Sequence, residues 1–302
     1  MIGNRYGILM LAASSWLLLC GMGPYRSAGA GTSSLGLADA QVASGVASAA
    51  LYSNPAGMSQ VQHSVFETGF ARSGQAGSGA PFVSYVDSTS AWGLAAGVGY
   101  AGELGWSTDA PIRRGHDVRM GLSMGGQSET TRLLVGASAR YLNITQGGHN
   151  VDGWTGDLGV TVGLQNLRLG AVVHNGLQLD PREAPRRVAV GAAFVGTQLV
   201  AEASGSWGVS NRDTALPGDG DGQSYRAGIG YQVGAEGLQL RAGYQFDQIV
   251  RGDPTRHWVC GGLSWRTTKA GIDFGGGVDA ANQHATMVSV SVVVLVPTEI
   301  SE

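Results

Sequence analysis

The chain has 302 residues, of which 50 are glycine, nine are proline and 14% are charged. So many glycines argue against a mostly helical protein, because each glycine inside a helix costs about 1 kcal/mol relative to alanine. At 43% hydrophobic the sequence is too apolar for a disordered chain. Its net charge of −3, with only one lysine among 19 basic residues, offers no broad basic surface, so nucleic acid is set aside as a partner. A β-rich globular or membrane protein remains.

Residues 1–30 have the pattern of an export signal. Arg5 supplies a positive start, Ile8 to Cys20 form a mostly apolar stretch, and Ala28-Gly29-Ala30 is a suitable cleavage site. We therefore predict a cleaved signal peptide over residues 1–30. A lipoprotein anchored at Cys20 is the rival interpretation, but leucine precedes that cysteine where a small residue is expected. The mature chain would keep one cysteine, Cys260, and hence no internal disulfide.

Apolar and polar residues alternate from Val65 to Val296, a period typical of strands with one apolar face. We predict fourteen strands, at 65–72, 81–87, 90–102, 117–127, 131–143, 154–165, 167–175, 186–196, 197–209, 224–234, 237–248, 255–267, 270–278 and 285–296. The gaps between them alternate long and short, as an up-and-down membrane barrel requires. The sequence thus predicts an all-β fold, a 14-stranded antiparallel transmembrane β-barrel over residues 61–302 in the bacterial outer membrane.

Two further patterns favour such a barrel over a secreted soluble β protein. Glycine gathers on the polar face, where it makes room for another piece of chain in a lumen. These glycines are Gly121, Gly125, Gly136, Gly159, Gly170, Gly191, Gly228, Gly230, Gly243 and Gly262. Aromatic residues gather near both ends of the apolar face, as in the two girdles of a membrane barrel. They are Trp92, Tyr231 and Trp265 at the end with short turns, and Tyr100, Tyr141, Trp154, Trp207 and Tyr225 at the end with long loops.

Residues 31–60 do not alternate. They are small and rich in alanine and serine, weakly helical around Leu35 to Val46, and forced to turn at Asn54-Pro55. A compact segment ahead of a glycine-lined barrel is expected to be a hatch, or plug, in the lumen.

One stretch of this segment carries a family resemblance. Ala49-Ala50-Leu51-Tyr52-Ser53-Asn54-Pro55-Ala56-Gly57-Met58, preceded by Gly36-Leu37-Ala38-Asp39-Ala40, resembles the N-terminal signature of the FadL/OmpP1 long-chain fatty-acid transporter superfamily and its shorter PorV-like relatives. The resemblance implies that Asn54, Pro55, Ala56 and Gly57 form a hatch motif ahead of a 14-stranded barrel.

The same resemblance implies two alternative functions. One is passive passage of a hydrophobic or amphipathic small molecule across the outer membrane. The other is a non-transporting, PorV-like barrel that acts as partner or anchor of a secretion or surface-motility machine. The sequence departs from the family pattern in its short loops and in the absence of a terminal phenylalanine after the last strand. The short loops and the charged lumen favour the second function, whereas the hatch motif is common to both.

Charged residues on the polar face are predicted to line the lumen. By parity they are Arg119, Arg132, Arg140, Arg168, Arg187, Arg226, Arg241, Arg256 and Arg266, against Glu67, Asp157, Glu202, Asp247 and Asp273. This excess of cations fits an anion-attracting pore or a clamp for a carboxylate head. It also fits ion pairs that hold the plug, which we favour because a guanidinium in an occluded space needs a partner.

The sequence indicates neither a cofactor nor an enzyme. Five histidines, His116, His149, His174, His257 and His284, fall near the loop end without the spacing of a metal pair. Cys260 is interpreted as a small filler on the lumen face. We expect no metal, no cofactor and no catalysis. The expected partners are outer-membrane lipid and either a hydrophobic ligand or a protein complex.

Overall fold

The structure is a computed structural model that describes residues 31–73, 78–90, 92–105, 113–128, 130–146, 148–177, 184–209, 222–234, 237–248, 255–281 and 285–296. The predicted signal peptide, most of the long loops, His284 and residues 297–302 lie outside the described residues.

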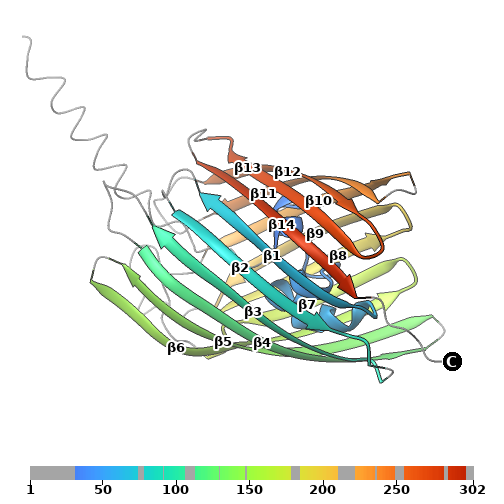
Figure 1. The fold of residues 1–302 in the computed structure, drawn as a ribbon. Helices are drawn as coiled ribbons and strands as arrows, with labels where there is room; N and C mark the ends of the chain where they lie inside the picture. Colours follow the sequence, from blue (N-terminus) through green and yellow to red (C-terminus); the bar gives the residue numbers. More distant parts are fainter. Residues whose placement is uncertain are drawn as a thin grey trace, which may run out of the picture.

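Fourteen strands form a closed antiparallel barrel, so the predicted fold is confirmed. The strands are β1 (Ser64–Ser73), β2 (Ser78–Asp87), β3 (Leu94–Gly105), β4 (Arg113–Gln127), β5 (Thr131–Gln146), β6 (His149–Leu164), β7 (Leu167–His174), β8 (Arg187–Val195), β9 (Leu199–Gly208), β10 (Gln223–Val233), β11 (Leu238–Gln248), β12 (Arg256–Arg266), β13 (Ala270–Asp279) and β14 (Thr286–Val296). Each strand pairs with its chain neighbours, and β14 pairs with β1 to close the ring (Figure 1). We call the end where β1 begins and β14 ends the turn end, and the opposite end the loop end.

The alternation along each strand separates an apolar outside from a polar inside. On β4, Leu122 and Met124 are 69% and 57% exposed, whereas the intervening Ser123 is buried. Outward valines on β14 and leucines on β5 and β6 repeat the pattern. An outer face that is apolar over the middle of every strand is what a membrane-spanning barrel requires.

Exposed aromatic rings lie toward both ends of this outer face. Trp92 and Trp265 are at the turn end, and Trp154 and Tyr225 are at the loop end. Tyr141 packs beside Trp154 with ring centroids 5.3 Å apart. The two groups occupy the levels at which amphipathic rings meet lipid headgroups.

Residues 31–60, which we call the N-terminal segment, lie inside the ring of strands (Figure 1, blue). The segment contains two short helices, α2 (Thr32–Gly36) and α3 (Ala47–Ser53), and a 3₁₀ helix, η2 (Pro55–Gln60). Helix α2 packs on β12 and β13, α3 on β2 and β3, and η2 on β4, β5 and β6.

The continuous helix expected around Leu35 to Val46 does not form. Helix α2 ends at Gly36, and the backbone then turns through Ala38 and Asp39, whose φ angles are +54° and +58°. Left-handed residues end a helix. The turns at 37–45 let the segment follow the curved inner wall instead of crossing the lumen as a rod.

Two connections differ from the sequence-based expectation. The gap predicted at 144–153 is wrong, because β5 extends to Gln146 and β6 begins at His149. Gly148, just before β6, has a φ of +84°. The polar residues there lie on extended strand ends, and Thr145 donates to Asn150 at 3.1 Å. The tight turn predicted at 88–89 is also wrong, since residues 88–93 form a longer connection. Ser88 ties this connection to the residue that follows the N-terminal segment by donating to the carbonyl of Val61.

The outward position of Ala242 on β11 gives a test of strand facing. Ala242→Arg should lower the free energy of unfolding by about 2–4 kcal/mol, because it places a guanidinium at mid-membrane depth. Gln248→Arg, at the loop end of the same outer face, should cost only about 0–1 kcal/mol. Urea titration of the heat-modifiable band in lipid vesicles measures both. Equal costs for the two variants would contradict the assigned facing.

Candidate functional site

Five pairs of glycines form a belt around the inside of the barrel. Each pair joins directly opposed residues of neighbouring strands, and the pairs are Gly97 with Gly121, Gly136 with Gly159, Gly170 with Gly191, Gly228 with Gly243, and Gly262 with Gly275. A Cβ atom at any of these ten positions would come within 3.1 Å of an atom of the N-terminal segment. The glycine belt therefore leaves the space that the segment fills. Of the glycines predicted on this face, Gly125 and Gly230 lie instead against side chains of neighbouring strands.

The Asn54-Pro55 turn sits in the recess of one glycine pair. A Cβ at Gly159 would lie 1.9 Å from the Asn54 Oδ1, and one at Gly136 would lie 2.4 Å from the backbone of Pro55. The buried Asn54 side chain donates to the carbonyls of Val42 at 2.8 Å and Val160 at 3.2 Å. Its Oδ1 accepts from the amide of Ala56 and so caps η2.

The other residues of the motif close this turn. Ala56 is fully buried, and a Cβ at Gly57 would lie 2.2 Å from the carbonyl oxygen of Gly45. The four motif residues thus fold the segment onto itself and onto β5 and β6 at one point.

Two buried carboxylates on the barrel wall hold the segment's backbone and side chains. Glu202 on β9 accepts the amides of Ala43 at 2.9 Å and Ser44 at 2.8 Å. Glu67 on β1 accepts from the Ser48 hydroxyl and, at 2.8 Å, from the Ser291 hydroxyl. Both acids were predicted in the lumen, and both bind neutral donors where the sequence suggested ion pairs.

Two arginines hold the C-terminal end of η2. Arg132 on β5 donates to the carbonyls of Gln60 at 2.6 Å and Ser59 at 2.9 Å. Arg168 on β7 donates to the Gln60 side chain. A cation at the last carbonyls of a helix is favourable because these oxygens have no partner within the helix.

A buried ionic cluster lies where α3 meets β4, β5 and β6. Asp117 accepts from Arg140 at 2.8 Å and from Arg119 at 3.3 Å, and Arg119 also contacts Asp157 at 3.5 Å. The Arg119 guanidinium lies over the ring of Tyr52, 4.8 Å from its centroid. Burial raises the pKa of the Tyr52 hydroxyl, which therefore stays protonated.

Asp117 is a buried charge of this cluster that the sequence analysis did not predict. It stands at the predicted start of a strand, where an acid is easily assigned to a loop. The signal was present in the parity, because Asp117 lies two residues before Arg119 and must share its face. The contact between Tyr52 and Arg119 could not be predicted from the sequence, since it depends on the position of α3 inside the barrel.

A second ionic cluster lies below α2 at the turn end. Asp273 on β13 is fully buried and accepts from Arg266 at 2.8 Å and from Arg241 at 3.4 Å. Arg241 also donates to Ser264. A Cβ at Gly36 would lie 3.2 Å from the Arg241 side chain. Arg241 therefore forms part of the wall surface on which α2 packs.

The remaining predicted charges lie at the loop end of β8 to β12. Arg187 donates to the Ser206 hydroxyl at 3.1 Å and the Gly222 carbonyl at 3.2 Å. Asp247 accepts from Ser224 and Gln245, both at 2.6 Å. Within the described part of the chain, Arg226 and Arg256 make no ion pair.

Cys260 is buried on the inner face against Ala38 and Trp258, which fits the filler role expected of it. Among residues with a described position, no group of three His, Cys, Asp or Glu side chains is arranged to hold a metal ion. No helix in the described ranges is long and apolar enough to span a membrane.

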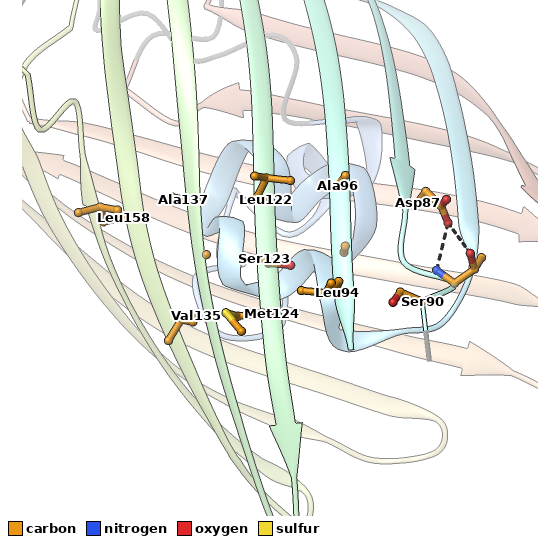
Figure 2. Close-up of a pocket in the computed structure, with 13 residues that line it drawn as sticks. Asp87, Ser90, Leu94, Ala96, Leu122, Ser123, Met124, Val135, Ala137 and Leu158 are labelled. Carbon is orange, nitrogen blue, oxygen red and sulfur yellow. Dashed lines mark hydrogen bonds between the residues drawn. The ribbon is translucent and has the colours of Figure 1, made fainter. Parts of the chain in front are cut away.

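A shallow hollow of about 770 Å³ lies on the outside of β3 to β6 (Figure 2). Its lining includes the exposed Leu94, Leu122, Met124 and Leu158, with small alanines between them. Asp87 borders it at the turn end and accepts from Thr89 at 2.8 Å. These apolar side chains face outward, so the hollow belongs to the membrane-facing surface and is separate from the lumen.

Comparison with known proteins gives structural matches only. The sequence matches no protein-family model and no curated protein. The solved structures that match include the toluene transporter TodX of Pseudomonas putida, at 15% identity and a TM-score of 0.61, covering 91% of this chain and 98% of TodX. A FadL homologue of Pseudomonas aeruginosa matches at 12% identity and a TM-score of 0.59, covering 87% of this chain and 98% of the homologue.

The toluene transporter TbuX of Ralstonia pickettii is a third match, at 15% identity and a TM-score of 0.56, covering 86% of this chain and 96% of TbuX. The three matches span nearly the whole of both chains. The chain therefore has the barrel fold of the FadL homologue, TodX and TbuX, as the sequence resemblance led us to expect.

The Asp117 cluster makes a specific stability prediction. Asp117→Asn should lower the free energy of unfolding by about 3–5 kcal/mol, because two buried guanidinium groups lose their shared counter-charge. The control Asp152→Asn removes an exposed acid from the outer face of β6 and should change stability by about 0.5 kcal/mol or less. Urea unfolding followed by tryptophan fluorescence measures both. A loss at Asp117 no larger than at Asp152 would contradict the ion pairing.

Proposed function

We propose that the chain is an outer-membrane barrel for passive passage of a hydrophobic or amphipathic small molecule, and that the N-terminal segment is the hatch that closes it. On this proposal residues 1–30 are removed during export, residues 31–60 form the hatch, and residues 61–302 form the barrel in outer-membrane lipid.

The observation that carries the proposal is the fit of the segment to the glycine belt. Strands in a solvated or lipid-facing position gain nothing from paired glycines, which weaken a strand. Here each pair borders the segment within van der Waals reach. A barrel whose wall is hollowed to hold a separate piece of chain is suited to being opened and closed.

The way the segment is held supports the same conclusion. Between the segment and the barrel wall, the described contacts are hydrogen bonds, apolar packing and one cation–π contact, such as those of Glu202, Arg132 and Arg119. A net contribution of about 1.5–3 kcal/mol is typical of one hydrogen bond to a charged group such as Glu202 or Arg132. Partial displacement of the segment therefore costs far less than unfolding the barrel.

The matched structures favour transport over the alternative function. TodX and TbuX are described as toluene transporters, and toluene is a small apolar molecule. The short loops of this chain argue for a simpler capture surface than in typical fatty-acid transporters. The alternative, a PorV-like partner of a secretion or motility machine, rests on the short loops and the charged lumen alone and becomes an outcome of the test.

The paired glycines supply the test of this function. Cells that express the wild-type chain should take up the apolar fluorophore N-phenyl-1-naphthylamine several-fold faster than cells with an empty vector. Gly159→Val should raise uptake further, because its side chain occupies the space of Asn54 and unseats the hatch. Gly261→Val is the matched control, since a Cβ there meets its nearest atom only at 3.8 Å.

Heat-modifiable migration on gels confirms that each variant is assembled. Uptake equal to the empty vector in the wild type and in Gly159→Val alike would contradict transport and favour the partner or anchor role. Equal uptake by Gly159→Val and Gly261→Val, both above the vector, would contradict the closure role of the segment.

A further inference from the structure

The arginines of the inner face fall into two groups. Six of them pair with a buried acid or hold the N-terminal segment: Arg119, Arg140, Arg241 and Arg266 by ion pairs, and Arg132 and Arg168 by hydrogen bonds to η2. The other three, Arg187, Arg226 and Arg256, lie at the loop end and make no ion pair with any acid in the described ranges. The excess positive charge of the lumen is thus concentrated on one part of the wall.

Arg187 and Arg226 flank β9 and share its inner face. Arg226 on β10 stands directly opposite Ser204 of β9, and Arg187 on β8 donates to Ser206, two residues further along. The Nε of Arg226 and the Oγ of Ser204 are buried and find no hydrogen-bond partner among the described residues. Two neighbouring buried polar groups without partners are unusual, because a buried donor or acceptor without a partner has lost its hydration and gained nothing in return.

The local charge balance is also incomplete. Among the described residues, the charged neighbours of Arg187 are Arg226, which repels it, and Asp247, which attracts it. Asp247 already accepts one hydrogen bond from the Ser224 hydroxyl at 2.6 Å. It accepts two more from the side-chain amide of Gln245, at 2.6 and 2.7 Å. Two guanidinium groups therefore act on one carboxylate whose hydrogen bonds come from neutral donors, and Arg256 stands opposite that carboxylate on β12, so the group carries an excess of positive charge.

We propose that Arg187 and Arg226, with the hydroxyl of Ser204, bind an oxyanion at the loop end of the lumen. Guanidinium groups present planar, paired donors that match a carboxylate, phosphate or sulfate group. Ser204 adds a hydroxyl donor opposite Arg226.

The proposed anion site lies close to the N-terminal segment. Gly228, two residues from Arg226 on the same inner face, borders Leu37, where a Cβ would meet the Leu37 carbonyl at 2.7 Å. An anion held by Arg226 therefore binds next to the glycine belt, above the turn that follows α2. A solute carrying an oxyanion group is bound at this point before it reaches the segment.

Isothermal titration of the purified barrel in nanodiscs with inorganic phosphate tests the proposal, at constant ionic strength set with sodium chloride. The wild type should bind one phosphate per barrel. The double variant Arg187→Gln/Arg226→Gln should lose at least tenfold in affinity. Arg114→Gln, which removes an exposed arginine from the outer face at the same end, should bind as the wild type does.

Absence of phosphate binding by the wild type, or equal affinity in the double variant, would overturn the proposal without bearing on uptake of an apolar probe. Titration with n-hexyl phosphate identifies the source of the oxyanion. Tighter binding than inorganic phosphate, lost in the same double variant, supports the headgroup of an amphiphile. Equal affinity for the two ligands supports a free polar solute.

Discussion

The structure depends on the space that opposed glycines leave on the inner wall. A barrel of eight strands is filled by its own side chains, and one of sixteen leaves an aqueous channel. Fourteen strands fall between these limits, and the five glycine pairs widen the lumen at one level by removing ten side chains. The N-terminal segment occupies that level. Its short helices and turns are dictated by the shape of the wall more than by their own helix propensity, since α2 has five residues and α3 seven.

Polar contacts then fix the segment at defined points. The buried amides of Ala43 and Ala56 and the last carbonyls of η2 would be costly without partners, and Glu202, Asn54 and Arg132 supply them. The ionic clusters around Asp117 and Asp273 pair the buried charges of the barrel wall with one another. Such contacts give the segment one position in the lumen, whereas apolar packing against glycine alone would permit several. At the loop end, Arg226 and Ser204 have buried polar atoms without a partner among the described residues, and we therefore expect an external anion there.

Much of the fold follows from a period of two in the sequence. Strand number, facing and the inward glycines could all be predicted, because alternation assigns each residue to a face without knowledge of the neighbours. Strand ends were less predictable. Polar residues such as Thr145 and Asp152 look like loop residues, although they belong to strands that extend beyond the apolar band.

The site could be predicted only in outline. Parity placed the lumen charges, and the N-P-A triplet indicated a turn of special importance. The pairing of Gly136 with Gly159 under that turn needs the register between strands, which one sequence does not contain. The distinction between paired and unpaired arginines likewise needs three-dimensional neighbours, because Arg119 and Arg226 look alike in their own strands.

Hydrogen–deuterium exchange of the peptide covering residues 40–60, followed by mass spectrometry, tests the central claim most directly. The account predicts that the wild-type peptide is protected for hours, that Gly159→Val exposes it within minutes while a peptide from β13 stays protected, and that Gly261→Val changes neither. Fast exchange of residues 40–60 in the wild type, or unchanged protection in Gly159→Val, would contradict the claim that the glycine belt seats the segment.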